Sequence, residues 1–117
     1  DFDFDGRANL VNADSSATKI SRGDTLVITL HWSHALASHH VFVHALDNTE
    51  QTWSAADVPL ERETRLELKF NDQTPFAVYR LELGVYPTNG DRVPVFDSHN
   101  QFVGDRIFLN PIRVMDR

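Results

Sequence analysis

The feature that most constrains the fold of this chain is a two-residue alternation of apolar and polar side chains. Leu26, Ile28 and Leu30 alternate with Val27, Thr29 and His31, and the same period returns over residues 66–70 and 79–85. Successive side chains of a β-strand point to opposite faces, so this period predicts strands with one buried face. The sequence has no sustained apolar repeat of about 3.6 residues with helix caps, so it predicts little or no helix.

Short turn segments separate the predicted strands. Asn89-Gly90 is the strongest, because both residues accept the positive φ of tight hairpin turns. We therefore expect residues 93–96 to return antiparallel to the strand before the turn, with Pro94 placing them at an edge. A closing strand over residues 107–114 is expected to bend at Pro111. About seven to nine short strands with such turns predict an all-β antiparallel sandwich.

Length and composition narrow the class of protein. The 117 residues fit a single domain over 1–117, and the abrupt start at Asp1 suggests a domain excised from a larger protein. The net charge of −6 without a basic run argues against binding to nucleic acid. Cysteine is absent, which excludes disulfides and thiolate chemistry. No apolar run reaches the ~18 residues that span a bilayer, so we expect no direct membrane insertion.

Several segments resemble a family of bacterial immunoglobulin-like β-sandwich domains, found beside membrane glycosyltransferases and in envelope proteins. The segments are Gly23-Asp24-Thr25-Leu26, Leu30-His31-Trp32, Val41-Phe42-Val43-His44-Ala45-Leu46-Asp47, Tyr79-Arg80-Leu81-Glu82-Leu83-Gly84-Val85-Tyr86, Arg92-Val93-Pro94-Val95 and Ile112-Arg113-Val114. Where the family often has a glycine-bearing turn, this chain has Asn48-Thr49-Glu50. The resemblance implies an immunoglobulin-like accessory or interaction domain in an extracytoplasmic or cell-envelope location. The implied partners are neighbouring domains of the parent protein or another protein.

Tyr79 invites a comparison with antibody-type domains. Those domains carry a tyrosine two residues before the second cysteine of a conserved pair, and its hydroxyl bonds back to the chain as a tyrosine corner. Tyr79 precedes Leu81 by this spacing, although both cysteines are missing. The sequence therefore predicts a tyrosine-corner role for Tyr79.

Histidines are concentrated in one stretch, residues 26–46. The five histidines there are His31, His34, His39, His40 and His44. Imidazole suits zinc, copper and nickel, and a hairpin between residues 26–33 and 41–46 would bring His31 and His44 together. The competing interpretation has His31 facing away from the apolar set, His44 buried and hydrogen-bonded, and the loop histidines in solvent. A histidine-based metal-binding domain is therefore our second alternative function.

The first six residues also contain a metal-like pattern. Asp1, Asp3, Asp5 and Gly6 match the opening of an EF-hand calcium loop. Asn12 stands where that loop needs a bidentate glutamate. The competing interpretation is a terminal strand with polar side chains on one face.

Exposed aromatic rings beside polar groups suggest a first alternative function, a carbohydrate-binding module. The candidate residues are Trp53, Tyr86, Asp91, Arg92, Asn100 and Phe102. Neither a nucleophile elbow nor a fixed zinc motif is present, so we expect a non-catalytic domain without a cofactor. The leading expectation is an accessory or interaction module, with a glycan as a possible ligand.

Overall fold

Eleven strands build the fold of residues 1–116, which are the residues that the computed structural model describes, and no helix occurs among them. The strands are β1 (Phe2–Asp3), β2 (Ala8–Ser15), β3 (Lys19–Ser21), β4 (Thr25–Ala35), β5 (His39–Leu46), β6 (Thr52–Pro59), β7 (Glu63–Lys69), β8 (Ala77–Pro87), β9 (Val95–Phe96), β10 (Phe102–Gly104) and β11 (Ile107–Met115). The alternation in the sequence located the strands β4, β7 and β8, and the all-β prediction is confirmed. The expected seven to nine strands are too few, because β1, β3, β9 and β10 have only two or three residues each and show no period.

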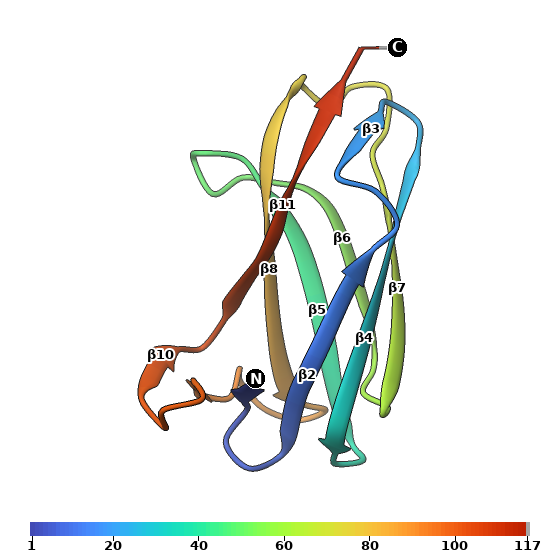
Figure 1. Cartoon of the computed structure of the whole chain (residues 1–117). Helices are drawn as coiled ribbons and strands as arrows, with labels where there is room; N and C mark the ends of the chain where they lie inside the picture. The colour runs from blue at the N-terminus through green and yellow to red at the C-terminus, as the bar shows by residue number, and fades with distance from the viewer. Residues whose placement is uncertain (117) are drawn as a thin grey trace.

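Two sheets pack against each other as a β-sandwich (Figure 1). Sheet A has the order β10-β9-β1-β2-β4-β7, and its neighbours are all antiparallel. Sheet B has the order β3-β11-β8-β5-β6 and is mixed, because β3 runs parallel to β11. The prediction of antiparallel pairing alone is therefore wrong. Only a hairpin forces neighbours to be antiparallel, and β3 joins sheet B after the chain has crossed from sheet A.

The strands β4 and β5 follow each other closely but belong to different sheets. Leu26 and Leu30 of β4 are fully buried, as are Val41 and Val43 of β5. These side chains meet across the core instead of lying side by side in one sheet. Residues 26–33 and 41–46 therefore do not form the hairpin that would bring His31 and His44 together.

Polar groups inside the sandwich have hydrogen-bond partners. The Trp32 indole is 3% exposed, packs edge-on against Phe4 with ring centroids 5.4 Å apart, and donates to Thr64 Oγ1 at 3.1 Å. The Thr64 hydroxyl in turn donates to the Glu61 carbonyl. Within residues 1–116 no buried side-chain nitrogen or oxygen is left without a partner. The core therefore carries no free-energy cost from unsatisfied polar atoms of its side chains.

The turn after β8 does not lead into a hairpin. The Gly90 N–H donates to the Pro87 carbonyl at 3.0 Å, but neither Thr88 nor Asn89 has a positive φ. The chain then crosses to sheet A, where β9 pairs with β1 and β10 instead of β8. The Val93 N–H still donates to the Val85 carbonyl at 2.9 Å, but β9 lies between β10 and β1 and is no edge strand. The predicted hairpin and edge position of residues 93–96 are therefore wrong beyond this one bond, because Asn-Gly permits the hairpin geometry without enforcing it. The register of β11 is irregular between Leu109 and Ile112, the segment where a bend at Pro111 is predicted.

The sandwich is elongated, with extents of 42 × 25 × 23 Å. The two ends of the described chain lie toward opposite ends of the long axis (Figure 1). A search of residues 1–116 finds no helix suited to crossing a membrane.

Tyr79 closes the corner at the start of β8. Its side chain is fully buried, and its hydroxyl donates to the Pro75 carbonyl at 2.6 Å. Burial raises the pKa of the Tyr79 hydroxyl, so it stays protonated and remains a donor. This is the backbone contact predicted for a tyrosine corner.

Replacing Tyr79→Phe should lower the free energy of unfolding by about 1 kcal/mol, because the ring stays packed and one hydrogen bond is lost. Urea denaturation followed by tryptophan fluorescence measures this change. Tyr86→Phe is the matched control, since its hydroxyl bond is exposed and its loss should cost about 0.5 kcal/mol or less. Equal stabilities of Tyr79→Phe and the wild type would contradict the role of the corner.

Candidate functional site

The candidate site lies on the outer face of sheet B. The strand β5 of this sheet carries large side chains on both of its faces. Val41 and Val43 point into the core, so His40, Phe42 and His44 point outward. Phe42 is nevertheless only 3% exposed. An outward aromatic side chain that is covered in this way marks a second small packed region outside the core.

Two neighbours hold the Phe42 ring in place. Gly84 lies opposite Phe42 on β8, and a Cβ at that position would come within 2.4 Å of two ring carbons. On the ring face, the Arg92 guanidinium carbon lies 4.5 Å from the ring centroid, which is a cation–π contact. The absence of a side chain at residue 84 therefore lets the ring sit on the strand, and the ring orients Arg92.

Glu82 is the charged centre of this face. It is 3% exposed, and its carboxylate lies 2.6 Å from Arg106 Nη1, 3.4 Å from Arg92 Nη1 and 3.1 Å from His44 Nδ1. Burial disfavours the ionised form, but the Arg106 hydrogen bond and the charges of Arg92 and Arg106 outweigh it. The pKa of Glu82 is therefore lowered.

The charge network continues toward the β5–β6 turn. Arg106 Nη1 also donates to Glu50 at 2.9 Å, and Arg80 donates to the other Glu50 oxygen at 2.5 Å. These two hydrogen bonds lower the pKa of Glu50. The guanidinium carbons of Arg80 and Arg106 each lie 4.9 Å from the Phe108 ring centroid. These contacts thus join the β5–β6 turn, β8, the residue before β11 and β11 itself across the outer face.

A second set of contacts surrounds Asp57 on β6. The Tyr86 hydroxyl donates to one oxygen of Asp57 at 2.5 Å, and His40 Nδ1 lies 3.3 Å from the other oxygen. The His40 and Tyr86 rings stack with centroids 5.3 Å apart. The hydrogen bond to Asp57 raises the pKa of Tyr86, so its hydroxyl stays protonated.

A depression of about 310 Å³ lies between these two sets of contacts. We call its side chains the outer-face cluster: Phe42, His44, Asp57, Tyr86, Asp91 and Arg92, with Gly90 at the rim. Two aromatic rings, one guanidinium, one imidazole and two carboxylates therefore face one open space. Such a surface can hydrogen-bond a polar ligand while an apolar part of that ligand packs on a ring.

The structure brings together three of the six carbohydrate candidates. Tyr86, Asp91 and Arg92 belong to the outer-face cluster. Trp53 is partly buried against the core, and its indole N–H donates to Asp47 at 2.9 Å. Asn100 and Phe102 lie elsewhere, at the β9–β10 hairpin of sheet A, where Phe102 is 66% exposed. A single surface built from all six is therefore not formed.

The histidines of residues 26–46 are distributed over both sheets. His31 faces outward on β4, 3.9 Å from Asp14, and the ring of His34 bonds to the Gly6 carbonyl. His39 bonds to the Ala37 carbonyl, and His40 and His44 belong to sheet B. The condition that would bring His31 and His44 together, a β4–β5 hairpin, is not met. Over residues 1–116 no three His, Asp or Glu side chains are grouped so that they could hold a metal ion.

The Asp-rich start of the chain forms a turn. The Gly6 N–H lies 3.2 and 3.3 Å from the two Asp3 carboxylate oxygens, and Asp5 pairs with Arg7 at 3.7 Å. Asp5 and Gly6 both have positive φ, which a tight turn requires. These contacts use the side chains that the calcium interpretation needs as ligands.

Sequence reasoning missed Phe42, Glu82 and Asp57 as members of one surface. The missing information is the strand register, which places His44 opposite Glu82 and Phe42 opposite both Gly84 and Asp57. A pattern within one strand cannot supply that register.

A comparison of the chain with known protein families and with curated proteins finds no match. The chemistry of the site is therefore interpreted from its own residues.

Glu82→Gln should lower the free energy of unfolding by about 1–3 kcal/mol at pH 7, because a buried charged acceptor is lost. The folded-state pKa of Glu82 lies below its ordinary value of 4.5. Its stabilising effect is therefore present above pH 4.5 and is lost as pH falls through the lower folded pKa. The difference between wild type and variant in urea denaturation should shrink as the pH is lowered over that range.

Glu67→Gln, which changes an exposed acid on β7, is the control and should change stability by about 0.5 kcal/mol or less. A Glu82→Gln effect that is the same at pH 7 and in acid would show that Glu82 does not act through its charge.

Proposed function

We propose that the chain is a non-catalytic, immunoglobulin-like β-sandwich that serves as an accessory or interaction module of a larger bacterial envelope-associated protein. Its partner is a neighbouring domain or another protein outside the cytoplasm. The observation that carries the proposal is the outer-face cluster, in which Tyr86, Phe42 and Arg92 meet on the central strands of sheet B. Aromatic residues and arginine are enriched at the centres of protein interfaces.

The topology supports the immunoglobulin-like part of the proposal. The strands β2, β4 and β7 correspond to A, B and E of that fold, and β5, β8 and β11 correspond to C, F and G. The strand β6 lies beside β5, where variable-type domains add a further strand. Tyr79 near the start of β8 matches the tyrosine at the start of strand F.

The ionisable groups of the face support binding over catalysis. The pKa values of Glu50 and Glu82 are lowered by arginine hydrogen bonds that outweigh desolvation, and the pKa of Tyr86 is raised by its bond to Asp57. These shifts move each pKa further from pH 7, whereas a general acid or base works best with a pKa near the working pH.

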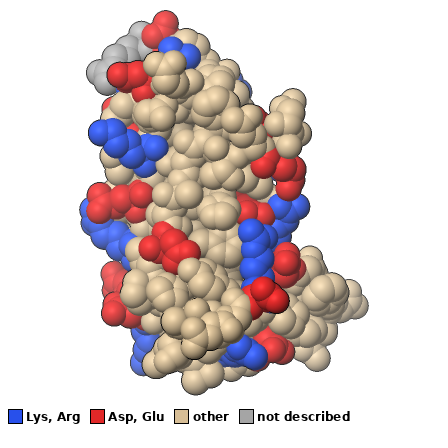
Figure 2. Space-filling view, turned by 180° about the vertical axis from the view of Figure 1, so that it is seen from behind, with Lys and Arg blue, Asp and Glu red and all other residues tan. Residues whose placement is uncertain are grey.

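The surface charge also restricts the partner. Acidic and basic side chains are interspersed over the side of the molecule seen in Figure 2. That side therefore presents no extended region of one sign to attract a polyion. A partner with mixed polar and apolar groups fits this surface.

Photo-crosslinking tests the interaction module. Tyr86→p-benzoylphenylalanine in cells that produce the parent protein should give a defined adduct, and Arg92→Ala should reduce its yield about fivefold or more. His31→p-benzoylphenylalanine, on the outer face of sheet A, is the position control. Equal adduct yields at positions 86 and 31, or no adduct at either, would count against the proposal.

A carbohydrate-binding module is the second candidate, because Tyr86, Asp91 and Arg92 line the same depression. A sugar ring has C–H groups that pack on an aromatic face and hydroxyls that bond to planar polar side chains. The depression offers both kinds of contact, although Tyr86 already bonds to Asp57. A sugar hydroxyl must therefore replace or extend the Tyr86–Asp57 bond.

A glycan array tests this candidate. Binding through the depression predicts a signal that falls about tenfold or more in Tyr86→Ala and Arg92→Ala, since each removes a central contact. Phe102→Ala, at the separate β9–β10 hairpin, is the matched control and should keep the wild-type signal. An array without signal, or loss in Phe102→Ala alone, would exclude the outer-face cluster as a glycan site.

A further inference from the structure

Two strand edges are left open where the sheets meet between β2 and β11. On one side, β1 pairs only with Leu10 and Asn9 of β2, so residues 12–15 have β4 as their single neighbour. On the other side, β3 pairs with β11 only at residues 113–115, so residues 107–110 have β8 as their single neighbour. Both edges lie along one side of the molecule (Figure 1).

The register of β2 with β4 shows which main-chain N–H and C=O groups of β2 do not bond to β4. The Ser16 N–H donates to the Val27 carbonyl at 2.8 Å. Hydrogen-bonded pairs alternate along an antiparallel ladder, so Asp14–Thr29 is also a hydrogen-bonded pair. The N–H and C=O groups of Ala13 and Ser15 therefore point away from β4 and toward the open side. They are the donors and acceptors that a further strand requires.

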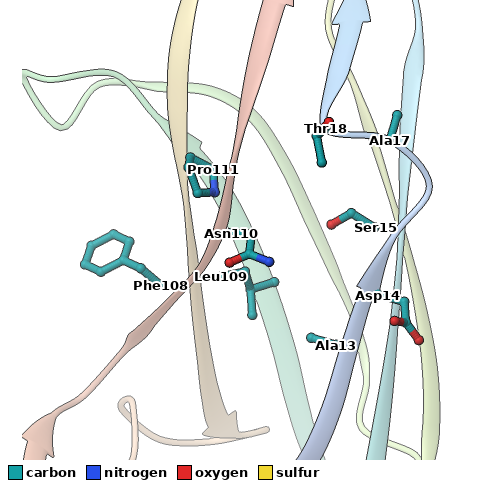
Figure 3. A pocket seen from close by; sticks show the side chains of 9 residues that line it. All are labelled: Ala13, Asp14, Ser15, Ala17, Thr18, Phe108, Leu109, Asn110 and Pro111. Carbon is teal, nitrogen blue, oxygen red and sulfur yellow. The ribbon is translucent and has the colours of Figure 1, made fainter.

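A groove runs between the two open edges. A depression of about 370 Å³ lies between residues 13–18 on one wall and residues 108–111 on the other. Figure 3 shows Leu109 and Asn110 directed toward Ala13 and Ser15, while Phe108 and Asp14 point away from the gap. A second depression of about 180 Å³ shares Ala13, Phe108 and Leu109 with the first and continues toward β1. We call the two together the β2–β11 groove.

We propose that the β2–β11 groove binds an extended peptide segment of a partner protein, which pairs antiparallel to β2 in line with β1. The strand β1 already occupies this edge at its lower end with that polarity. Beyond Leu10 the groove continues along the same line, so the peptide takes the position that β1 leaves open. This mode is strand addition to a sheet edge, in which main-chain bonds supply the affinity.

The walls of the groove define the peptide further. Ala13, Val11 and Leu109 offer apolar contacts, and Val11 is 49% exposed. The charged residues at the two depressions, Asp1 and Asp14, are both acidic, and the Asp14 side chain points out of the gap toward the exposed face of β2. Alternate residues of a strand face opposite sides, so the fitting peptide has apolar residues at every second position and lysine or arginine between them. The groove thus selects a basic, alternating segment.

The peptide pairs with β2 and not with β11, because the edge of β11 is interrupted. Pro111 has no N–H, and the register of β11 is irregular between Leu109 and Ile112, so its edge is interrupted. The register of β2 is regular from Asn12 to Ser15. The strand β11 therefore supplies an apolar wall, while β2 supplies the ladder. This site lies apart from the outer-face cluster and does not depend on the role proposed for that cluster.

Amide exchange and a synthetic peptide test the inference. In the free chain, the amides of Ala13 and Ser15 should exchange with solvent faster than those of Asn12 and Asp14, which face β4. The peptide acetyl-KVKVKVK-amide should slow exchange at Ala13 and Ser15 about tenfold or more, as a new ladder forms. Its acidic counterpart acetyl-EVEVEVE-amide should bind about fivefold more weakly or worse.

Two matched controls isolate the main-chain bonds. The same basic peptide with N-methyl groups on alternate residues keeps its side chains but loses donors, and should bind about tenfold more weakly. Ser15→Pro removes one groove-facing N–H of the chain and should weaken binding about fivefold or more, whereas Ser15→Thr keeps that N–H and should bind like the wild type.

Three results would overturn the proposal. The first is slow exchange of Ala13 and Ser15 in the free chain, and the second is equal binding of the N-methylated peptide. The third is a peptide that shifts the NMR signals of Tyr86 and Arg92 instead of those in the groove. The N-methylated peptide leaves the protein unchanged, so the test holds whether or not Ser15→Pro folds.

Discussion

The packing of β5 on both faces is the constraint on which the rest of this molecule depends. Its inward residues, Val41 and Val43, complete the core against sheet A. Its outward Phe42 sits on Gly84 of β8, so at this residue the strand is covered outside as well as inside. A side chain at position 84 would displace the ring, and the Arg92 contact with it. The core and the outer-face cluster therefore share one strand, and neither can be repacked independently of the other.

The buried Glu82 holds three neighbouring side chains in place. This role is separate from its contribution to the free energy of unfolding. Removing a carboxylate from water costs several kcal/mol, and paired charges often do no more than offset that cost. The three groups around Glu82, however, come from different segments: His44 on β5, Arg92 after β8 and Arg106 before β11. One carboxylate thus fixes three side chains of one face. A binding surface benefits from such order, because less conformational entropy is lost when a ligand arrives.

The sequence determined the strands of this fold better than their arrangement. The two-residue period located β4, β7 and β8, and the spacing at Tyr79 predicted a tyrosine corner, which the bond to the Pro75 carbonyl forms. The same period could not assign β4 and β5 to sheets. An apolar face can be buried by a neighbour in the same sheet or by a strand across the core, and both satisfy the same pattern.

The site shows the same division between local and long-range information. Tyr86, Asp91 and Arg92 were identified because turn and strand patterns left them outside the core. Phe42 and Glu82 were missed, because a large apolar residue and a strand glutamate gain their roles only from cross-strand neighbours. The histidines of residues 26–46 are spread over the molecule for a related reason: residues close in sequence are separated because β4 and β5 belong to different sheets.

The strand edges of the two sheets differ in how they discourage pairing with a further strand. This difference explains why the open edge of β2 can accept one. The edge strand β7 carries alternating charges outward, and the edge strand β6 ends at Pro59, so both discourage further pairing. The edge of β2 has neither lysine nor proline over Asn12–Ser15. Its neighbour on the open side is β11, whose residues 108–111 form the opposite wall of the β2–β11 groove. An edge guarded in this way resists sheet-to-sheet aggregation and still admits a single extended chain.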